Sequence, residues 1–190
     1  MPSIDVVIPA LNEERALPRV LGDIPRPPVR RVVVADNGST DATAIVAAGH
    51  GAEVGHEPER GYGAACLRAL APLAPDPPDI VVFLDGDYSD HPDELPSLVQ
   101  PILDKRAELV IGSRAMGRAE RGSLSSQQRV GNAIASAALR TLYGARYTDL
   151  GPFRAIRWDS LQHLQMCDRN YGWTVEMQIK AARRGKRPVS

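Results

Sequence analysis

The sequence predicts an α/β fold in which a mostly parallel central sheet carries helices on both faces. Short apolar runs alternate along the chain with stretches of helical length, and strands that alternate with helices in this way pair in parallel. Residues 80–84 form one continuous apolar run, which is typical of a strand buried on both faces. With 190 residues the chain can form a substantial core, and we expect residues 1–190 to be a single domain.

The expected strands and helices alternate regularly as far as Arg114. The pattern then changes to a loop rich in Gly, Arg and Ser at residues 115–123, followed by a long helix. Ser39 or Thr40 is a candidate N-cap for the second helix, because a hydroxyl group can accept a backbone N–H there. The expected strands are residues 4–8, 31–35, 53–54, 80–84, 109–111 and 151–156, with the beginning of another at 187–190, and the expected helices end near residues 21, 48, 70, 103, 143 and 184.

The composition argues against several classes of function. Lys and Arg number 23, as do Asp and Glu, so the zero net charge does not favour binding to nucleic acid or to an anionic membrane. The chain contains no apolar stretch as long as a membrane span, and its first residues do not resemble a signal peptide. We therefore expect a cytoplasmic protein without a transmembrane segment, in which Cys66 and Cys167 are reduced.

Two carboxylates, Asp85 and Asp87, directly follow the apolar run and are separated by one glycine. Residues i and i+2 of an extended chain point to the same side, so both carboxylates should face one point beyond the strand. Two such charges about 4 Å apart repel each other by roughly 4 kcal/mol at an effective dielectric constant near 20. A hard divalent cation that also binds phosphate oxygens would offset this repulsion. The alternative is a solvated turn, since Asp and Gly are common in turns.

Polar loops follow two further strands at the same edge of the predicted sheet. Residues 9–13 follow the first strand and residues 36–39 follow the second. Ligands of open α/β sheets bind at the carboxyl ends of the strands, so a nucleotide pocket is the leading hypothesis. The stretch 60–63, Arg-Gly-Tyr-Gly, is not a dinucleotide-binding fingerprint, because it follows the wrong strand and the next small residue is Ala64.

In this order the motifs resemble those of the family 2 glycosyltransferases, which have the GT-A fold, a Rossmann-like α/β architecture. The resemblance covers essentially the whole chain and includes later segments at residues 110–114, 148–155 and 171–177. It is strongest to the branch that contains dolichol-phosphate mannose and glucose synthases and their bacterial polyprenyl-phosphate relatives. The resemblance implies a nucleotide-sugar-binding half at residues 1–114 and an acceptor-side half at 115–190, which ends before the usual basic C-terminal segment of the branch.

The resemblance also implies roles for individual residues. Asp85 and Asp87 match the carboxylates that bind Mg²⁺ or Mn²⁺ on the diphosphate of a nucleotide-sugar. Asp36 would hydrogen-bond the base, whereas Asn37 departs from the branch, in which a second aspartate is common. The residues expected to bind the UDP- or GDP-sugar and its metal are Pro9, Asn12, Glu13, Asp36, Gly38, Arg60, Gly61, Asp85 and Asp87.

Four residues are candidates for the transfer step. Arg114 and Arg129 lie where the resemblance places basic side chains that meet an acceptor phosphate. A phosphate acceptor is already anionic and needs little deprotonation, whereas a hydroxyl acceptor needs a carboxylate base. Asp149 is the first candidate for that base and Glu176 the second. The alternatives are capping or pairing with an arginine for Asp149 and a structural salt bridge for Glu176.

The expected function is that of a metal-dependent, inverting glycosyltransferase that moves a sugar from a nucleotide-diphosphate sugar to a lipid phosphate of the polyprenyl type. The metal would act as a Lewis acid toward the departing nucleoside diphosphate. A lipid acceptor implies peripheral contact with the inner face of the membrane, and an open sheet edge would favour a homodimer. Trp173 is either a core anchor or an aromatic contact for the acceptor. The alternatives are a sugar-phosphate nucleotidylyltransferase, which would need a Gly-rich loop after the first strand, and a non-catalytic nucleotide-sugar-binding module.

Overall fold

Seven strands form one sheet in the computed structural model, which describes residues 2–112, 151–184 and 188–189. Their order is β3-β2-β1-β4-β6-β5-β7. Strand β6 is antiparallel to both of its neighbours, and all the remaining pairs are parallel. The mostly parallel sheet expected from the sequence is thus confirmed. The strands are β1 (Ile4–Ala10), β2 (Val29–Asp36), β3 (Glu53–His56), β4 (Ile80–Phe83), β5 (Leu109–Ile111), β6 (Arg154–Arg157) and β7 (Pro188–Val189).

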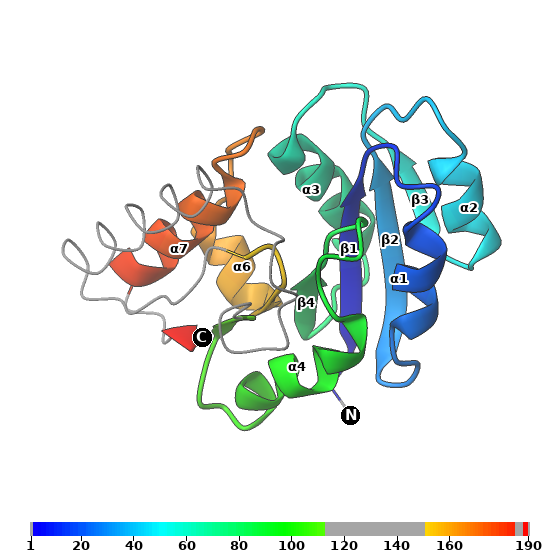
Figure 1. Ribbon diagram of the computed structural model, residues 1–190. Coiled ribbons are helices and arrows are strands. Elements are labelled where there is room, and N and C mark those ends of the chain that lie inside the picture. The colour runs from blue at the N-terminus through cyan, green and yellow to red at the C-terminus, as the bar shows by residue number, and fades with distance from the viewer. Residues whose placement is uncertain (1, 113–150, 185–187, 190) are drawn as a thin grey trace, which may run out of the picture.

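Helices cover both faces of the sheet, as expected (Figure 1). One face carries α1 (Leu17–Asp23), α2 (Thr43–Gly49) and α4 (Leu95–Leu103), and the other carries α3 (Tyr62–Leu70), α6 (Trp158–Leu164) and α7 (Trp173–Arg183). The short 3-10 helices η1 (Ala71–Leu73) and η2 (Pro92–Glu94) follow α3 and precede α4. No helix within the described ranges is long and apolar enough to cross a membrane.

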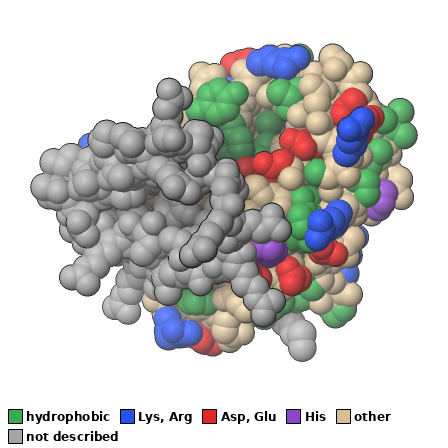
Figure 2. Space-filling view, viewed as in Figure 1, with side chains coloured by type: hydrophobic (Ala, Val, Ile, Leu, Met, Phe, Trp, Pro, Cys, Tyr) green, Lys and Arg blue, Asp and Glu red, His purple; other side chains and the backbone are tan. Residues whose placement is uncertain are grey.

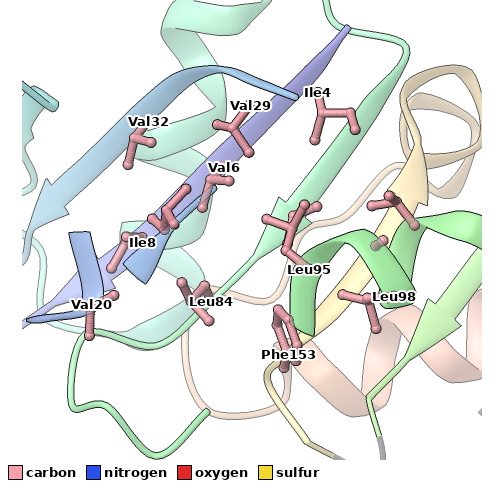
Figure 3. Close-up of a cluster of buried hydrophobic side chains, with 14 of the residues drawn as sticks. Ile4, Val6, Ile8, Val20, Val29, Val32, Leu84, Leu95, Leu98 and Phe153 are labelled. Atoms are coloured by element: carbon pink, nitrogen blue, oxygen red, sulfur yellow. The ribbon is translucent and has the colours of Figure 1, made fainter. Parts of the chain in front are cut away.

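Alternate side chains of β1, β2, β4, β5 and β6 enter two separate hydrophobic layers. On β1, Val6 and Ile8 pack in the layer of α1 and α4, whereas Val7 packs in the layer of α3. Figure 3 shows the first layer, in which Leu95 and Phe153 close over the sheet. Burying each such large side chain contributes roughly 1.5–3 kcal/mol. Because β4 supplies residues to both layers, all four of its positions are apolar.

Most of the expected elements are present, and one helix was not expected. The strand expected to begin at 187–190 is present as β7. Helix α6 has only seven residues and one short apolar stripe, so its periodicity is a weak signal in the sequence. The expected loop at 115–123 and the expected helix ending near residue 143 lie outside the described residues.

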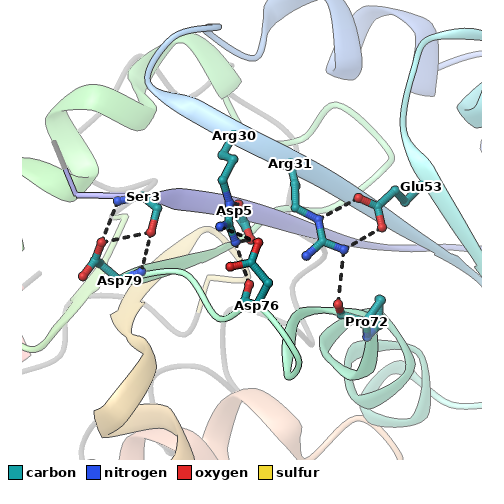
Figure 4. A network of polar contacts seen from close by, with 8 residues as sticks. All are labelled: Ser3, Asp5, Arg30, Arg31, Glu53, Pro72, Asp76 and Asp79. Carbon is teal, nitrogen blue, oxygen red and sulfur yellow. Dashed lines mark hydrogen bonds and ion pairs between the residues drawn. The ribbon is translucent and has the colours of Figure 1, made fainter.

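Ion pairs hold the amino ends of the first three strands together. Asp5 on β1 is fully buried and accepts hydrogen bonds from Arg30 of β2 at 2.7 and 3.0 Å (Figure 4). The same guanidinium contacts Asp76 at 2.9 Å, and Arg31 binds Glu53 of β3 at 2.7 Å. Removing Arg30 would leave the buried charge of Asp5 without this partner, which is destabilising. The network therefore secures the end of the sheet opposite the polar loops.

Candidate active site

A cavity of about 260 Å³ lies at the carboxyl ends of β1 and β4, the edge at which the sequence predicted a ligand site. Figure 2 shows a hollow on this side of the molecule, bordered by acidic side chains. The loops after β1, β2 and β4, the beginning of α3 and the segment before α7 form its walls. The lining residues are Pro9, Ala10, Leu11, Glu13, Asn37, Arg60, Gly61, Tyr62, Ala65, Asp85, Gly86, Asp87 and Tyr171.

Three carboxylates, those of Glu13, Asp85 and Asp87, line this cavity. Asp85 is partly buried, whereas Asp87 is exposed and its Oδ1 accepts the backbone N–H of Ser89 at 2.8 Å. Burial, followed by the negative charges of Asp87 and Asp41, raises the pKa of Glu13. Negative charge is therefore concentrated at the end of β4, and this concentration favours a bound cation.

These carboxylates fit a divalent cation that takes further ligands from a bound molecule. Asp85 and Asp87 offer oxygen ligands, which hard cations such as Mg²⁺ and Mn²⁺ prefer. Within the described ranges, no group of three or more His, Cys, Asp or Glu side chains could hold a metal. A cation at this place would therefore depend on oxygen atoms supplied by the ligand, such as those of a diphosphate.

Two residues that interact with Asp85 were not expected from the sequence to belong to the site. The hydroxyl group of Tyr62 donates a hydrogen bond to Asp85 Oδ1 at 3.0 Å. Burial, followed by the charges of Cys66 and Asp85, raises the pKa of Tyr62, so the phenol is protonated at neutral pH. Arg154 on β6 is fully buried; burial lowers its pKa, and neighbouring groups that include Tyr62 and Asp85 oppose that shift. The presence of a charge within the apolar stretch 153–156 could have identified Arg154 from the sequence. No feature of the sequence pointed to Tyr62.

Asn12 ties the loop after β1 to the loop after β2. Its backbone N–H donates to Ser39 Oγ at 2.9 Å, and its side-chain Oδ1 accepts the backbone N–H of Thr40 at 2.8 Å. The cap expected from Ser39 or Thr40 is wrong: α2 begins at Thr43, its N-cap residue is Ala42, and the backbone N–H of Thr43 donates to Asp41 Oδ1 at 3.0 Å. Asn12 does not itself line the cavity, but it holds the loop that carries Glu13, which does line it.

Asp36 and Gly38, which were expected to bind the nucleotide-sugar, do not line the cavity. Asp36 is buried; its Oδ1 accepts the backbone N–H of Ser39 at 3.0 Å, and its Oδ2 lies 3.4 Å from Nδ1 of His56. Gly38 adopts a φ of 79°, and its carbonyl oxygen accepts a hydrogen bond from Arg60 at 3.2 Å. Arg60 itself lines the cavity. The role of Asp36 in base recognition stays a prediction.

The buried side chain of Asn37 holds the loop that leads to α3. Its amide nitrogen donates to the carbonyl oxygens of Glu57 at 3.1 Å and Glu59 at 2.7 Å, and its Oδ1 accepts the backbone N–H of Gly61 at 2.9 Å. An aspartate could accept from Gly61 but could not donate to the two carbonyl groups. The departure from the family pattern at this position therefore serves the structure of the loop.

Gly61 and Gly63 allow the segment before α7 to pack directly on the first turn of α3. The backbone N–H groups of Gly63 and Ala64 donate to the carbonyl oxygens of Asn170 and Arg169, at 3.0 and 2.9 Å. Gly61 has a φ of 150°, and a Cβ at this position would overlap the carbonyl oxygen of Arg169. The glycines thus permit a contact between two backbones.

Glu176 on α7 fixes the same segment from the other side. Its carboxylate accepts the backbone N–H groups of Cys167 at 3.1 Å and Asp168 at 2.9 Å, and it pairs with Lys180 at 2.7 Å. Burial alone would raise the pKa of Glu176, but the contacts with Lys180, Cys167 and Asp168 outweigh burial and lower the pKa to about 2. Glu176 does not line the cavity, and so low a pKa makes it a weak base. These contacts support the structural alternative for Glu176.

Of Tyr171 and Trp173, near the start of α7, only Tyr171 borders the cavity. Trp173 is 1% exposed and its ring centroid lies 6.1 Å from that of Phe83, so it is a core anchor. Tyr171 is 85% exposed on the rim. The other candidates for the transfer step, Arg114, Arg129 and Asp149, lie outside the described residues.

The fold and the cavity define an α/β protein that is suited to bind a diphosphate-bearing ligand with a divalent cation at the carboxyl end of its sheet. Residues 5–165 of the chain match the family described as Glycosyl transferase family 2. The chain belongs to this family, and the protein is a glycosyltransferase.

Two similar proteins illustrate the range of the family. An uncharacterised glycosyltransferase of Mycobacterium tuberculosis (strain H37Rv) is 41% identical over 188 residues, which cover 98% of this chain and 82% of that protein. An undecaprenyl-phosphate mannosyltransferase of Micrococcus luteus is 30% identical, with coverage of 96% of this chain and 79% of that protein. Both similarities span nearly the whole of this chain.

Solved structures of similar fold include glucosyl-3-phosphoglycerate synthase from Mycobacterium tuberculosis. Its complex with Mn²⁺, UDP-glucose and phosphoglyceric acid has a TM-score of 0.77 and 31% sequence identity to this chain, and its complex with UDP has a TM-score of 0.75. The first comparison covers 96% of this chain and 66% of that one, so this chain spans about two thirds of the length of the solved protein. The likeness confirms the GT-A fold.

Proposed function

We propose that this glycosyltransferase transfers a sugar, with inversion, from a UDP-sugar to an acceptor that carries a phosphate group, and that it requires Mg²⁺ or Mn²⁺. The observation that carries the proposal is the pair Asp85 and Asp87 in the cavity at the end of β4. The structures of glucosyl-3-phosphoglycerate synthase with Mn²⁺ and UDP-glucose support both the cation and the donor.

The residues of the cavity divide into two groups by their chemistry. Pro9 and Arg60, at the end nearer β1 and β2, offer an apolar surface and one cation for the nucleotide. Asp85 and Asp87 would hold the divalent cation on the diphosphate. The bound cation supplies Lewis-acid stabilisation of the nucleoside diphosphate as it departs.

The acceptor we propose is a polyprenyl phosphate. Its phosphate oxygen is already anionic and needs no base, and Glu176 is poorly suited to act as one because contacts lower its pKa to about 2. The similarity to an undecaprenyl-phosphate mannosyltransferase supports this choice. Phosphoglyceric acid, which glucosyl-3-phosphoglycerate synthase binds, also carries a phosphate group but offers a hydroxyl group as well, and it is the acceptor to compare.

Transfer assays with labelled UDP-glucose and Mn²⁺ test the proposal, with a short polyprenyl phosphate and phosphoglyceric acid as alternative acceptors. We expect a labelled lipid product whose anomeric configuration is inverted, and none with the Asp87→Asn variant. Transfer to phosphoglyceric acid alone would contradict the lipid acceptor and leave the donor site intact. Formation of UTP from UDP-glucose and pyrophosphate would instead identify a nucleotidylyltransferase. Binding without any turnover would identify a non-catalytic module.

A further inference from the structure

The hydrogen bond between Tyr62 and Asp85 joins two elements that are each held rigidly. Tyr62 is the first residue of α3, and its hydroxyl group donates to Asp85 Oδ1 at 3.0 Å. The turn that follows is fixed, because the N–H groups of Gly63 and Ala64 are bonded to the segment before α7. The Tyr62 ring packs against the hydrophobic layer of α3, so the hydroxyl group is aimed by both its backbone and its ring.

A fixed positive charge lies on the strand next to Asp85. Arg154 is paired in register with Phe83, two residues before Asp85, and is fully buried. Its guanidinium donates to the carbonyl oxygens of Gly151, of Pro152 at 3.3 Å and of Thr174 at 3.1 Å. A guanidinium held in this way cannot swing into the cavity, so Arg154 leaves the contact between Tyr62 and Asp85 undisturbed.

The two carboxylates of the pair are therefore held differently. Asp85 is partly buried and is held by Tyr62, a side chain from another element. Asp87 is exposed, and its Oδ1 accepts a hydrogen bond from Ser89, two residues along the same loop. Asp85 is thus the more strongly positioned of the two.

We propose that Tyr62 is a positioning residue that holds Asp85 so that this carboxylate meets the divalent cation through one oxygen atom rather than through both. The inference rests on the proposed function, in which Asp85 is a ligand of the cation. Mg²⁺ requires near-octahedral coordination and is bound through single carboxylate oxygens, whereas Ca²⁺ accepts bidentate carboxylates and more ligands. A carboxylate whose Oδ1 is held by a phenol therefore favours the smaller cation.

The Tyr62→Phe variant tests this role, because it removes the hydroxyl group and keeps the ring. Cation affinities are measured by calorimetry at saturating UDP, with Mg²⁺ and with Ca²⁺, and circular dichroism confirms that the variant is folded. We expect the ratio of Ca²⁺ to Mg²⁺ affinity to rise about tenfold, the equivalent of one charge-assisted hydrogen bond. A role confined to packing would leave this ratio unchanged.

Tyr88→Phe is the matched control. The Tyr88 hydroxyl also donates to a carboxylate, that of Asp23 on α1, and Tyr88 does not line the cavity. We expect this variant to keep the wild-type ratio. An unchanged ratio in Tyr62→Phe, or an equal rise in both variants, would overturn the role of Tyr62 while the proposed function stands. Cation-independent binding of UDP to the wild-type protein would overturn both.

Discussion

Two asparagine side chains at the carboxyl edge of the sheet use their amide groups differently. Asn37 uses both its nitrogen and its oxygen, whereas Asn12 uses its oxygen to accept from Thr40. We expect Asn37→Asp to lower the free energy of unfolding by about 1–3 kcal/mol, because two carbonyl groups lose their donor and a carboxylate replaces a buried amide. Urea unfolding followed by circular dichroism measures the change.

The matched variant is Asn12→Asp, which keeps the acceptor oxygen and tolerates the positive φ of 59°. We expect its free energy of unfolding to stay within about 0.5 kcal/mol of the wild-type value. Equal losses in the two variants would contradict the interpretation of Asn37 as a double donor.

At the residue scale, the sequence identified the groups that carry charge into the cavity but not those that hold them. Asp85 and Asp87 were predictable because two carboxylates directly follow an apolar strand. The phenol that contacts Asp85 comes from α3, and no local pattern links Tyr62 to residue 85. Asn12 was expected to bind the nucleotide-sugar but does not line the cavity. Its side chain instead accepts a hydrogen bond from Thr40 of the neighbouring loop, a contact that the sequence alone does not predict.

At the scale of elements, the contact between α3 and the segment before α7 depends on glycine. A Cβ at Gly63 would overlap the carbonyl oxygen of Asp168, whereas a Cβ at Gly22 in α1 would meet no atom within 4 Å. We expect Gly63→Ala to destabilise the protein by about 1–3 kcal/mol or more, because the two backbones must separate. Gly22→Ala should instead be neutral or stabilise by up to about 1 kcal/mol, through helix propensity.

Thermal unfolding of the two glycine variants measures this difference. Equal melting temperatures for Gly63→Ala and Gly22→Ala would show that the segment before α7 does not pack on α3 as described.

The anchoring of that segment by Glu176 predicts a dependence of stability on pH. The folded-state pKa of Glu176, about 2, lies below the ordinary glutamate value of 4.5. Its contribution is therefore present above pH 4.5 and is lost as the pH falls toward 2. We expect Glu176→Gln to be less stable than wild type at neutral pH, and the difference to shrink on acidification.

Urea unfolding at neutral pH and at about pH 3 tests this expectation, since most of the difference should be lost over that interval. Glu94→Gln, which alters an exposed carboxylate in η2, is the control. Its free energy of unfolding should equal that of wild type at both pH values. A difference between wild type and Glu176→Gln that does not change with pH would refute the anchoring role.

The elements were largely predictable because their signals are local. Apolar runs marked the strands, including the buried β4, and prolines and glycines marked their ends. The unexpected α6 and the shifted start of α2 depend on contacts between distant residues, such as the bond from Asn12 to Ser39. The direction of β6 is also a property of the assembled sheet, because a strand pattern does not encode orientation.

At the scale of the whole molecule, stability and chemistry lie at opposite ends of one sheet. The ion pair of the buried Asp5 with Arg30 holds the amino ends of β1 and β2, where an oppositely charged partner compensates the carboxylate. At the carboxyl ends, the cavity gathers Glu13, Asp85 and Asp87, and the charges of Asp87 and Asp41 add to burial in raising the pKa of Glu13. The alternation of strands and helices predicted this edge as the ligand site.

The central claim is that the acidic cavity binds a nucleoside diphosphate only together with a divalent cation. Calorimetric titration of UDP into the protein tests it most directly, with Mn²⁺, with EDTA, and with the Asp87→Asn variant in Mn²⁺. Asp93→Asn, an exposed carboxylate outside the cavity, serves as the control. We predict binding to wild type and to the control in Mn²⁺, and a loss of at least about tenfold in affinity in the other two conditions. Equal affinity in all four titrations would contradict the claim.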